Sequence, residues 1–247
     1  MDKRDKIEKF FFLKEIGVNM LSPEEAEKMR RVLLIKPPSE RFKKEEENKQ
    51  KEVLSSGLSL KEKFLSEIEK EIAQCKKCPL FSTRKNYVFG EGSMDAEIMF
   101  IGEAPGEEED NQGRPFVGKA GKKLTEMIKA MGFEREDVFI ANIVKCRPPG
   151  NATPTPQIRR TCFPYLQKQI AIIKPKVLIA LGNVAAQTLL DTKETITRLR
   201  GKFGKYQGIP VMPTYHPSYV IRNYTVAVRK AVWEDLKKVL ALLNENR

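Results

Sequence analysis

Residues 96–102, AEIMFIG, form a short apolar run that ends in glycine. Similar runs follow, VFIANIVK at 138–145, KVLIALG at 176–182 and IPVMPTYHPS at 209–218. Helical patterns lie between or after them, at 120–132, 158–173, 183–190 and 227–243. Nearly continuous apolar strands that alternate with helices are typical of a parallel sheet buried on both faces. The sequence therefore predicts an α/β fold with three layers, αβα, around a mainly parallel four-stranded sheet.

The first seventy residues have a different pattern. Charged, helix-like segments cover 8–17, 22–35 and 60–75, and a turn-rich charged stretch at 36–59 reads as a linker. We expect residues 1–70 to form a helical N-terminal extension, and residues 71–247 to form the α/β domain. The extension carries no recognisable chemistry, and we regard it as a candidate contact for a protein partner.

The charge of the chain is concentrated in its second half. The formal net charge is +12, and residues 111–247 contain 24 basic and nine acidic side chains. Acidic residues are absent from 138–190 and from 195–233. A lysine-rich solvated surface normally intersperses acidic residues, so these stretches favour a face for a phosphate backbone. No apolar stretch reaches the length of a membrane span.

Four cysteines, at Cys75, Cys78, Cys146 and Cys162, are the only ones in the chain. The first two form a C-x2-C pair, and the fold must bring the other two to it. Four thiolates suit either zinc or an iron–sulfur cluster. Disulfides are the less favoured reading, because the first residues, MDKRDKIEKF, contain no apolar signal segment, and buried structural thiols remain an alternative. We expect a cytoplasmic protein associated with the nucleoid of a prokaryote, and the Lys and Glu content is typical of thermophiles.

Polar segments follow three of the predicted strands, at the edge where ligands of parallel sheets bind. Glu103 lies in the turn GEAPG, Asn142 ends an apolar strand, and the single histidine, His216, precedes Pro217 and Ser218. Phe116 lies between glycines in GRPFVG and could either stack on a planar base or plug the core. Asn142 could likewise be a satisfied internal amide, and His216 a structural turn residue.

These motifs together resemble those of the family 4 uracil-DNA glycosylases, the iron–sulfur branch of that superfamily. The resemblance rests on C-x2-C-P, on residues 90–121, on NIVKCRPPGNATP, on C-F-P and on TYHPSYVIRN. It covers about seventy per cent of the chain, from Cys75 to the last helix. It implies an enzyme that flips uracil out of single- or double-stranded DNA and hydrolyses its N-glycosidic bond, leaving an abasic site.

The resemblance also implies residue roles. The four cysteines would hold a structural [4Fe–4S] cluster, with zinc as the alternative. Phe116 would stack on the base, Asn142 would read its Watson–Crick edge, and the backbone of Glu103 and Ala104 would contact it. Glu109 would crowd the C5 position, where thymine carries a methyl group. His216 would face uracil O2. Pro217 and Ser218 would begin a loop that enters the minor groove, and Arg222 would lie near a phosphate.

Bond cleavage leaves the sugar cationic and the uracil anionic, so donors placed at the anion accelerate the reaction. We expect His216 to be this donor, and Glu103 to orient water or stabilise the cation, because Ala104 stands where family 1 enzymes have an aspartate. No motif indicates a lysine nucleophile, so a monofunctional glycosylase is expected. We also expect the protein to be a monomer. The alternative is a non-catalytic DNA-binding module braced by a cluster or zinc, which would not need Glu103, Phe116, Asn142 and His216 together.

Overall fold

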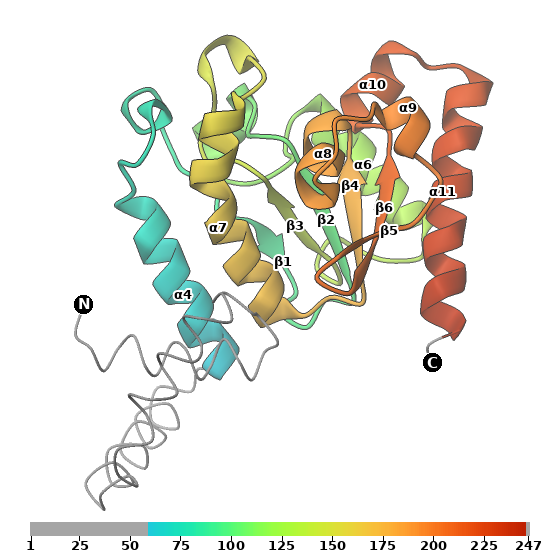
Figure 1. Ribbon diagram of the computed structural model, residues 1–247, viewed down its shortest axis with the longest axis horizontal. Helices are drawn as coiled ribbons and strands as arrows, with labels where there is room; N and C mark the ends of the chain where they lie inside the picture. Colours follow the sequence, from blue (N-terminus) through green and yellow to red (C-terminus); the bar gives the residue numbers. More distant parts are fainter. Residues whose placement is uncertain (1–58, 246–247) are drawn as a thin grey trace, which may run out of the picture. The chain divides into compact units, whose positions relative to one another are not determined.

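The structure is a computed structural model that describes residues 59–245 (Figure 1). The helical segments expected at 8–17 and 22–35, and the linker up to residue 58, lie outside the described residues. The chain divides into the units Met1–Ser66 and Glu67–Arg247. Of the first unit, only the beginning of helix α4 (Leu60–Ala73) is described, and this helix agrees with the one expected at 60–75. None of the described helices is both long and apolar enough to cross a membrane.

The second unit is built on one six-stranded sheet with the strand order β1-β3-β2-β4-β6-β5. Strands β3, β2, β4 and β6 are parallel, and they are the four strands expected from the sequence. Two short antiparallel strands, which were not predicted from the sequence, extend the sheet at its edges. The strand bounds are β1 (Glu91–Gly92), β2 (Ile98–Gly102), β3 (Phe139–Asn142), β4 (Val177–Leu181), β5 (Gly204–Tyr206) and β6 (Ile209–Thr214).

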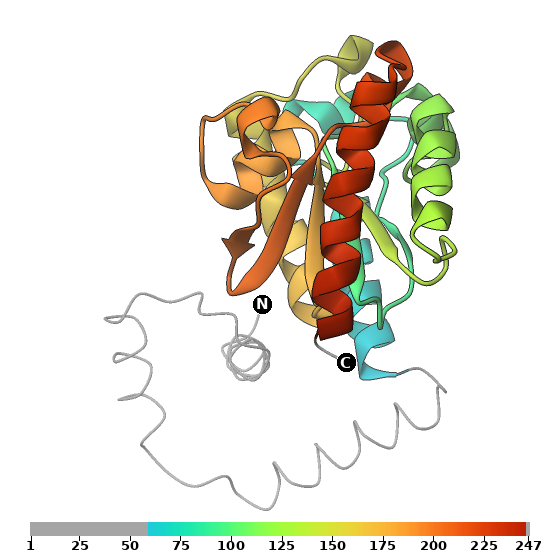
Figure 2. The ribbon, with the colours of Figure 1, turned by 90° about the vertical axis from the view of Figure 1, so that its right-hand side faces the viewer.

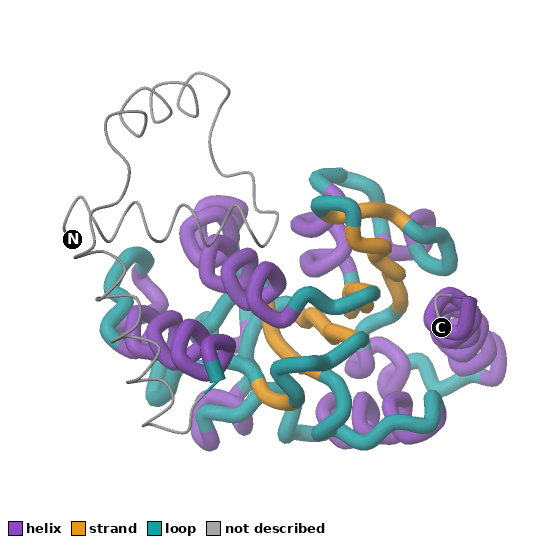
Figure 3. The backbone as a smooth tube through the Cα atoms, turned by 90° about the horizontal axis from the view of Figure 1, so that it is seen from below, coloured by secondary structure: helices purple, strands orange, loops and turns teal. Residues whose placement is uncertain are grey.

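Helices cover both faces of this sheet, which confirms the predicted α/β fold with three layers, αβα (Figures 2 and 3). On one face, side chains of α6 and α11 pack with Phe100 and Ile140 in one apolar cluster. Helices α7 and α8 cover the other face. The helix bounds are α5 (Glu107–Gln112), α6 (Lys119–Ala130), α7 (Pro156–Ile173), α8 (Asn183–Leu190), α9 (Ile196–Leu199), α10 (Pro217–Arg222) and α11 (Val226–Glu245), with single 3-10 turns η1 (Pro79–Ser82) and η2 (Pro149–Asn151).

Two segments for which the sequence predicted no helix are helical. Residues 107–112 form α5, whose first turn contains only acidic residues, and negative charge stabilises a helix N-terminus. The helix ends at Gly113, which has a φ of 69°. The expected minor-groove loop at Pro217 is instead the first turn of α10, with Pro at the first helical position.

Candidate active site

The carboxyl ends of the parallel strands bring three predicted motifs to one edge of the sheet. Gly102 of β2 pairs in register with Asn142 of β3, so the GEAPG turn begins beside this asparagine. The backbone N–H of Val144 donates to the carbonyl of Glu103 at 3.1 Å and continues the pairing beyond the strands. At the end of β4, the backbone N–H of Gly182 donates to the carbonyl of Thr214 at 2.9 Å. Thr214 ends β6 and lies two residues before His216.

Two glycines allow the functional side chains to approach the ends of β2 and β4. A Cβ atom on Gly102 would lie 2.4 Å from Asn142 Oδ1 and 2.5 Å from Phe116 Cζ. A Cβ on Gly182, whose φ of 87° also disfavours other residues, would lie 3.0 Å from the Cβ of His216. Because these side chains approach backbone directly, Asn142, Phe116 and His216 gather around the ends of neighbouring strands. The ring centroids of Phe116 and His216 are 5.7 Å apart.

Asn142 is 2% exposed, and its Oδ1 atom accepts no hydrogen bond within the described part of the chain. A buried amide oxygen without a donor is costly, so such atoms in native proteins need an explanation. The sequence alone is compatible with an internally satisfied amide at this position. Its Oδ1 atom is not satisfied internally, and it lies beside the aromatic ring expected to stack on a base.

Phe116 is 6% exposed and belongs to the apolar cluster formed with α6 and α11. The two readings of this residue, a core plug and a stacking platform, therefore meet in one side chain that is packed against the core and lies near His216. Its backbone has a φ of 51°, in the left-handed region that residues other than glycine rarely adopt.

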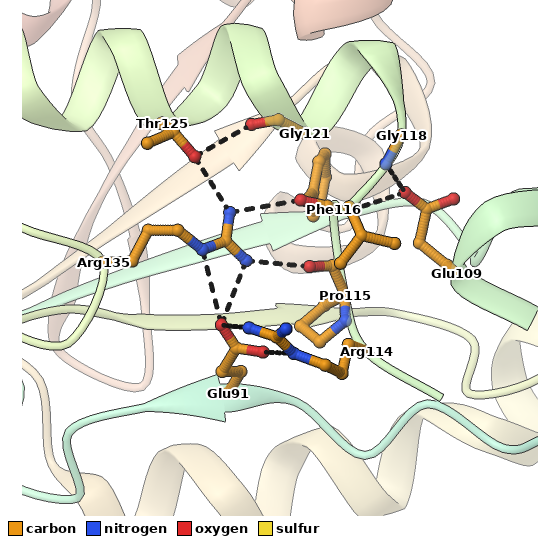
Figure 4. Close-up of polar contacts among 10 residues, drawn as sticks. Glu91, Glu109, Arg114, Pro115, Phe116, Gly118, Gly121, Thr125 and Arg135 are labelled. Atoms are coloured by element: carbon orange, nitrogen blue, oxygen red, sulfur yellow. Dashed lines mark hydrogen bonds and ion pairs between the residues drawn. The ribbon is translucent and has the colours of Figure 1, made fainter. Parts of the chain in front are cut away.

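Glu109 is buried, and its carboxylate accepts hydrogen bonds from the backbone at the start of α5 and from the loop that contains Phe116, between α5 and α6. Its Oε1 atom accepts from the N–H groups of Val117 at 2.8 Å and Gly118 at 3.0 Å, and its Oε2 atom accepts from Gly106 at 3.0 Å. The carboxylate thus ties the loop of Phe116 to the start of α5 (Figure 4 shows its contact with Gly118). The contact with C5 of the base remains a prediction, and the structure gives Glu109 a role in holding the loop.

His216 has a defined tautomer. Its Nδ1 atom accepts from the backbone N–H of Ser218 at 3.1 Å, and the Ser218 hydroxyl lies 2.7 Å from the same atom. An Nδ1 that accepts from an amide carries no proton, so the neutral ring carries its hydrogen on Nε2. Burial, assisted by the nearby charge of Arg222, lowers the pKa of His216 to about 4. At neutral pH this side chain is an uncharged Nε2–H donor.

Glu103 is half-buried directly after β2. Burial raises the pKa of its carboxyl, while a hydrogen bond with Thr153 and the charge of Arg159 act in the opposite direction. Neither Thr153 nor Arg159 was singled out from the sequence, because a threonine in a Pro-rich loop and a helical arginine carry no distinguishing pattern. Ala104 follows in the same turn, half-buried like Glu103.

The predicted DNA contacts lie on α10. Pro217 is buried and Arg222 is exposed in the last turn of the helix, while the Ser218 hydroxyl is engaged with His216. Their contact with DNA remains a prediction. The position of Ser218 beside His216 shows a second use of this residue that the sequence did not reveal.

The four cysteines line one cavity, together with Ile72, Phe81, Arg84, Lys145, Thr161 and Tyr165. Cys146 and Cys162 are buried, and Cys75 and Cys78 are half-buried. No three cysteine, histidine, aspartate or glutamate side chains between residues 59 and 245 form a group that could hold a single metal ion as they stand. The donor set of the cavity is nevertheless uniform, because its four cysteines are joined by no carboxylate or imidazole.

The surroundings of the thiols supply positive charge and N–H donors. Arg84 Nη1 donates to Cys146 Sγ at 3.2 Å, and the N–H of Lys145 donates to Cys162 Sγ at 3.3 Å. Burial raises the pKa of Cys146, and it raises that of Cys162 to about 12. Such thiols ionise at neutral pH only when a bound cation or cluster stabilises the thiolate. The cavity thus fits a thiolate-bound group, and Arg84 was not predicted because only its charge marks it in the sequence.

Comparison with known proteins agrees with this geometry. The family profile described as "Uracil DNA glycosylase superfamily" matches residues 89–237, which include Glu103, Phe116, Asn142 and His216. The chain belongs to the uracil-DNA glycosylase superfamily.

Within this superfamily the chain is similar to proteins named type-4 uracil-DNA glycosylase. It is 45% identical to the one from Thermotoga maritima, over 75% of this chain and 97% of that protein. It is 48% identical to the one from Sulfurisphaera tokodaii, over 72% and 84%, and 44% identical to the one from Archaeoglobus fulgidus, over 71% and 91%. The resemblance to family 4 predicted from the motifs is confirmed.

Proposed function

We propose that the protein is a monofunctional uracil-DNA glycosylase of type 4, which flips uracil out of DNA and hydrolyses its N-glycosidic bond. Superfamily membership and the similarity to the type-4 enzymes support this activity. The observation that carries the site assignment is the buried Oδ1 atom of Asn142, which lacks a donor in the described residues. A base with a ring N–H beside a carbonyl oxygen supplies the donor that Oδ1 lacks, and its carbonyl oxygen can accept from the Asn142 amide N–H.

Recognition of the flipped base then divides between edge and face. Asn142 accepts from N3–H of uracil and donates to O4, and the ring of Phe116 stacks on the base. The backbone of Glu103 and Ala104 closes the remaining edge. Cytosine presents an acceptor at N3 where uracil presents a donor, so it leaves Asn142 Oδ1 unpaired, and this mismatch disfavours cytosine.

Departure of the base places negative charge on uracil O2. The neutral His216 ring donates from Nε2 to this oxygen, and the hydrogen bond strengthens as charge develops. Because the pKa of His216 is lowered to about 4, the ring acts by donating a hydrogen bond rather than by transferring a proton at neutral pH.

Glu103 stands at the mouth of the same turn and is the acidic side chain assigned to the sugar. As a carboxylate it stabilises the sugar cation or orients the attacking water. Its raised pKa limits this role to pH values at which the carboxyl is ionised.

We assign Cys75, Cys78, Cys146 and Cys162 as ligands of a [4Fe–4S] cluster, with zinc as the alternative group. Bound there, the cluster supplies crosslinking between distant segments, and no step of base excision depends on it. The thiols join the turn after α4, the loop after β3 and helix α7. Loss of a ligand therefore acts mainly on folding.

We assign the DNA face to Pro217, Ser218 and Arg222 and to the two stretches without acidic residues. The enzyme acts as a monomer on uracil in single- or double-stranded DNA, and the N-terminal extension contacts a protein partner.

Single-turnover excision should be compared on oligonucleotides that carry uracil, thymine or cytosine, for the wild-type protein, Asn142→Ala and the exposed control Asn244→Ala. Uracil excision lost only in Asn142→Ala supports the assignment. Equal rates in both variants would remove Asn142 from the site, and no excision by the wild-type protein would favour the non-catalytic module.

A further inference from the structure

The backbone at Phe116 is held in a strained conformation. A φ of 51° at a non-glycine residue costs free energy, and it persists only where surrounding contacts impose it. Helix α6 also presses against this residue, because a Cβ on Gly121 would lie 1.9 Å from the carbonyl oxygen of Phe116. Hydrogen bonds and packing around Phe116 must therefore stabilise this backbone conformation.

Arg135 provides these contacts from outside the loop (Figure 4). Its Nη1 atom donates to the carbonyl of Phe116 at 3.2 Å, and its Nη2 atom donates to the carbonyl of Pro115 at 2.9 Å. Nη1 also donates to Thr125 Oγ1 at 3.2 Å. Nε and Nη2 donate to Glu91 Oε1 at 3.4 and 3.3 Å. A guanidinium has five N–H donors, and these five contacts use all of them.

Four polar atoms of the three peptide groups between Pro115 and Gly118 are thus held in pairs. Arg135 binds the carbonyls of Pro115 and Phe116, and Glu109 binds the N–H groups of Val117 and Gly118. Arg135 is half-buried, with 15% of its side chain exposed, and its charge is balanced by Glu91. This arrangement fixes the main chain on both sides of the Phe116 ring.

We infer that Arg135 is a positioning residue for uracil recognition, which acts by holding Phe116 in the strained conformation that places its ring beside His216 and Asn142. This inference rests on the proposed role of Phe116 in stacking on the base. All five N–H donors of Arg135 are engaged by Pro115, Phe116, Thr125 and Glu91, so the side chain acts on the loop rather than on the base.

A guanidinium suits this position better than an ammonium. Its planar fork reaches two successive carbonyls, a hydroxyl and a carboxylate at once, whereas lysine has three donors on a single nitrogen. Arg135→Lys should therefore keep the charge that Glu91 needs but lose part of the hold on the loop.

The test is a double-mutant cycle between Arg135→Met and Phe116→Ala, measured as single-turnover excision of uracil from an oligonucleotide. Misplacing a positioned group by about 1 Å can cost a factor on the order of 100 in rate, so Arg135→Met alone should slow excision by about 10- to 100-fold. In the Phe116→Ala background the same change should alter the rate by no more than about twofold, because the ring that it positions is absent. A purely structural role would give the same loss in both backgrounds.

Arg114→Met is the matched control. Arg114 pairs with the same Glu91 carboxylate, at 2.7 Å from Nε, but it is largely exposed and bonds to neither carbonyl of the Phe116 loop. Its variant should excise uracil within about twofold of the wild-type rate. If Arg135→Met does not fold, Arg135→Lys replaces it in the cycle, with a smaller loss that again disappears in the Phe116→Ala background.

The outcomes are distinguishable. A wild-type rate in Arg135→Met, or losses that multiply in the double variant, overturn the inference and leave the role of Phe116 intact. A wild-type rate in Phe116→Ala overturns the stacking role and the inference with it. No excision by the wild-type protein contradicts the proposed function itself.

Discussion

The Nδ1 atom of His216 accepts a hydrogen bond from the backbone N–H of Ser218 at 3.1 Å, which places the ring hydrogen on Nε2. The contact arises because His216 is the N-cap of α10, and it leaves the opposite nitrogen available for a ligand. Helix capping and the proposed catalytic role therefore depend on the same ring, and we expect its removal to affect both.

His216→Ala should slow single-turnover excision by a factor on the order of 10²–10³, the usual loss for one preorganised donor. Affinity for uracil-containing DNA should change little, because the hydrogen bond strengthens only as charge develops on O2. Rate and affinity are measured separately, by quenched-flow excision and by titration of a non-cleavable analogue. Excision at the wild-type rate would return His216 to the role of a helix cap.

The pH dependence of excision follows from two shifted pKa values. The pKa of Glu103 is raised, so its carboxylate is lost as the pH falls through that value, and the rate should fall with it. His216, with a pKa of about 4, stays neutral down to that pH and should add no step between pH 8 and 6. Because the unfolded chain binds this proton more readily, His216 also removes stability as the pH falls from about 6.5 towards 4.

Glu103→Gln tests this assignment. The glutamine variant should be slower at neutral pH and should lack the acid-side decline expected of the wild-type protein, whose Glu103 has a raised pKa. A decline at an unchanged pH in this variant would assign the titrating group elsewhere. Circular dichroism at each pH separates loss of catalysis from unfolding.

The cysteine cavity predicts a coloured protein. Anaerobically purified protein should absorb broadly at about 400 nm, as thiolate-bound iron–sulfur clusters do. Cys146→Ser and Cys162→Ser should lose this absorption and lower Tm, because each ties a distant segment to the Cys75–Cys78 turn. Excision per folded molecule should change far less than in His216→Ala. A colourless wild-type protein with one equivalent of zinc would replace the cluster by the zinc alternative.

The sequence was most informative where burial is continuous. β2, β3 and β4 are buried at every residue, so their apolar runs identified the parallel core directly. The edge strand β1 has two residues and β5 has three, too few for a pattern to develop. Helix α5 was missed because it has no apolar face, and its start depends on the backbone of Gly106 and on Glu109.

The site was only partly visible in the sequence for a related reason. Glu103, Asn142 and His216 follow or end strands, and topology predicts that such residues meet. Arg135 binds the main-chain carbonyls of Pro115 and Phe116, and every residue type has such a carbonyl. The side chains at these two positions therefore do not reveal the contact. The left-handed backbone of Phe116 could not be predicted either, because a positive φ is normally marked by glycine in a sequence.

Deletion of residues 1–58 should leave excision of uracil within about twofold of the full-length rate, because every residue assigned to the site lies beyond the deletion. The measurement is single-turnover excision at matched concentrations of folded protein. A folded truncation without activity would show that the extension belongs to the active site.

Binding of DNA should weaken steeply with salt if the stretches without acidic residues face the phosphates, because neutralised phosphates release counterions. Arg222 is exposed at the end of α10, on the edge of the sheet where His216 lies. Arg222→Ala should therefore reduce the slope of log affinity against log salt by about one.

Lys129 is the matched control, since it is exposed at the C-terminal end of α6 and this helix runs back towards the opposite edge. Lys129→Ala should leave the slope unchanged. Equal slopes for Arg222→Ala and the wild-type protein would exclude a phosphate contact at Arg222, and a flat salt profile for all three proteins would contradict a DNA face built from the basic stretches.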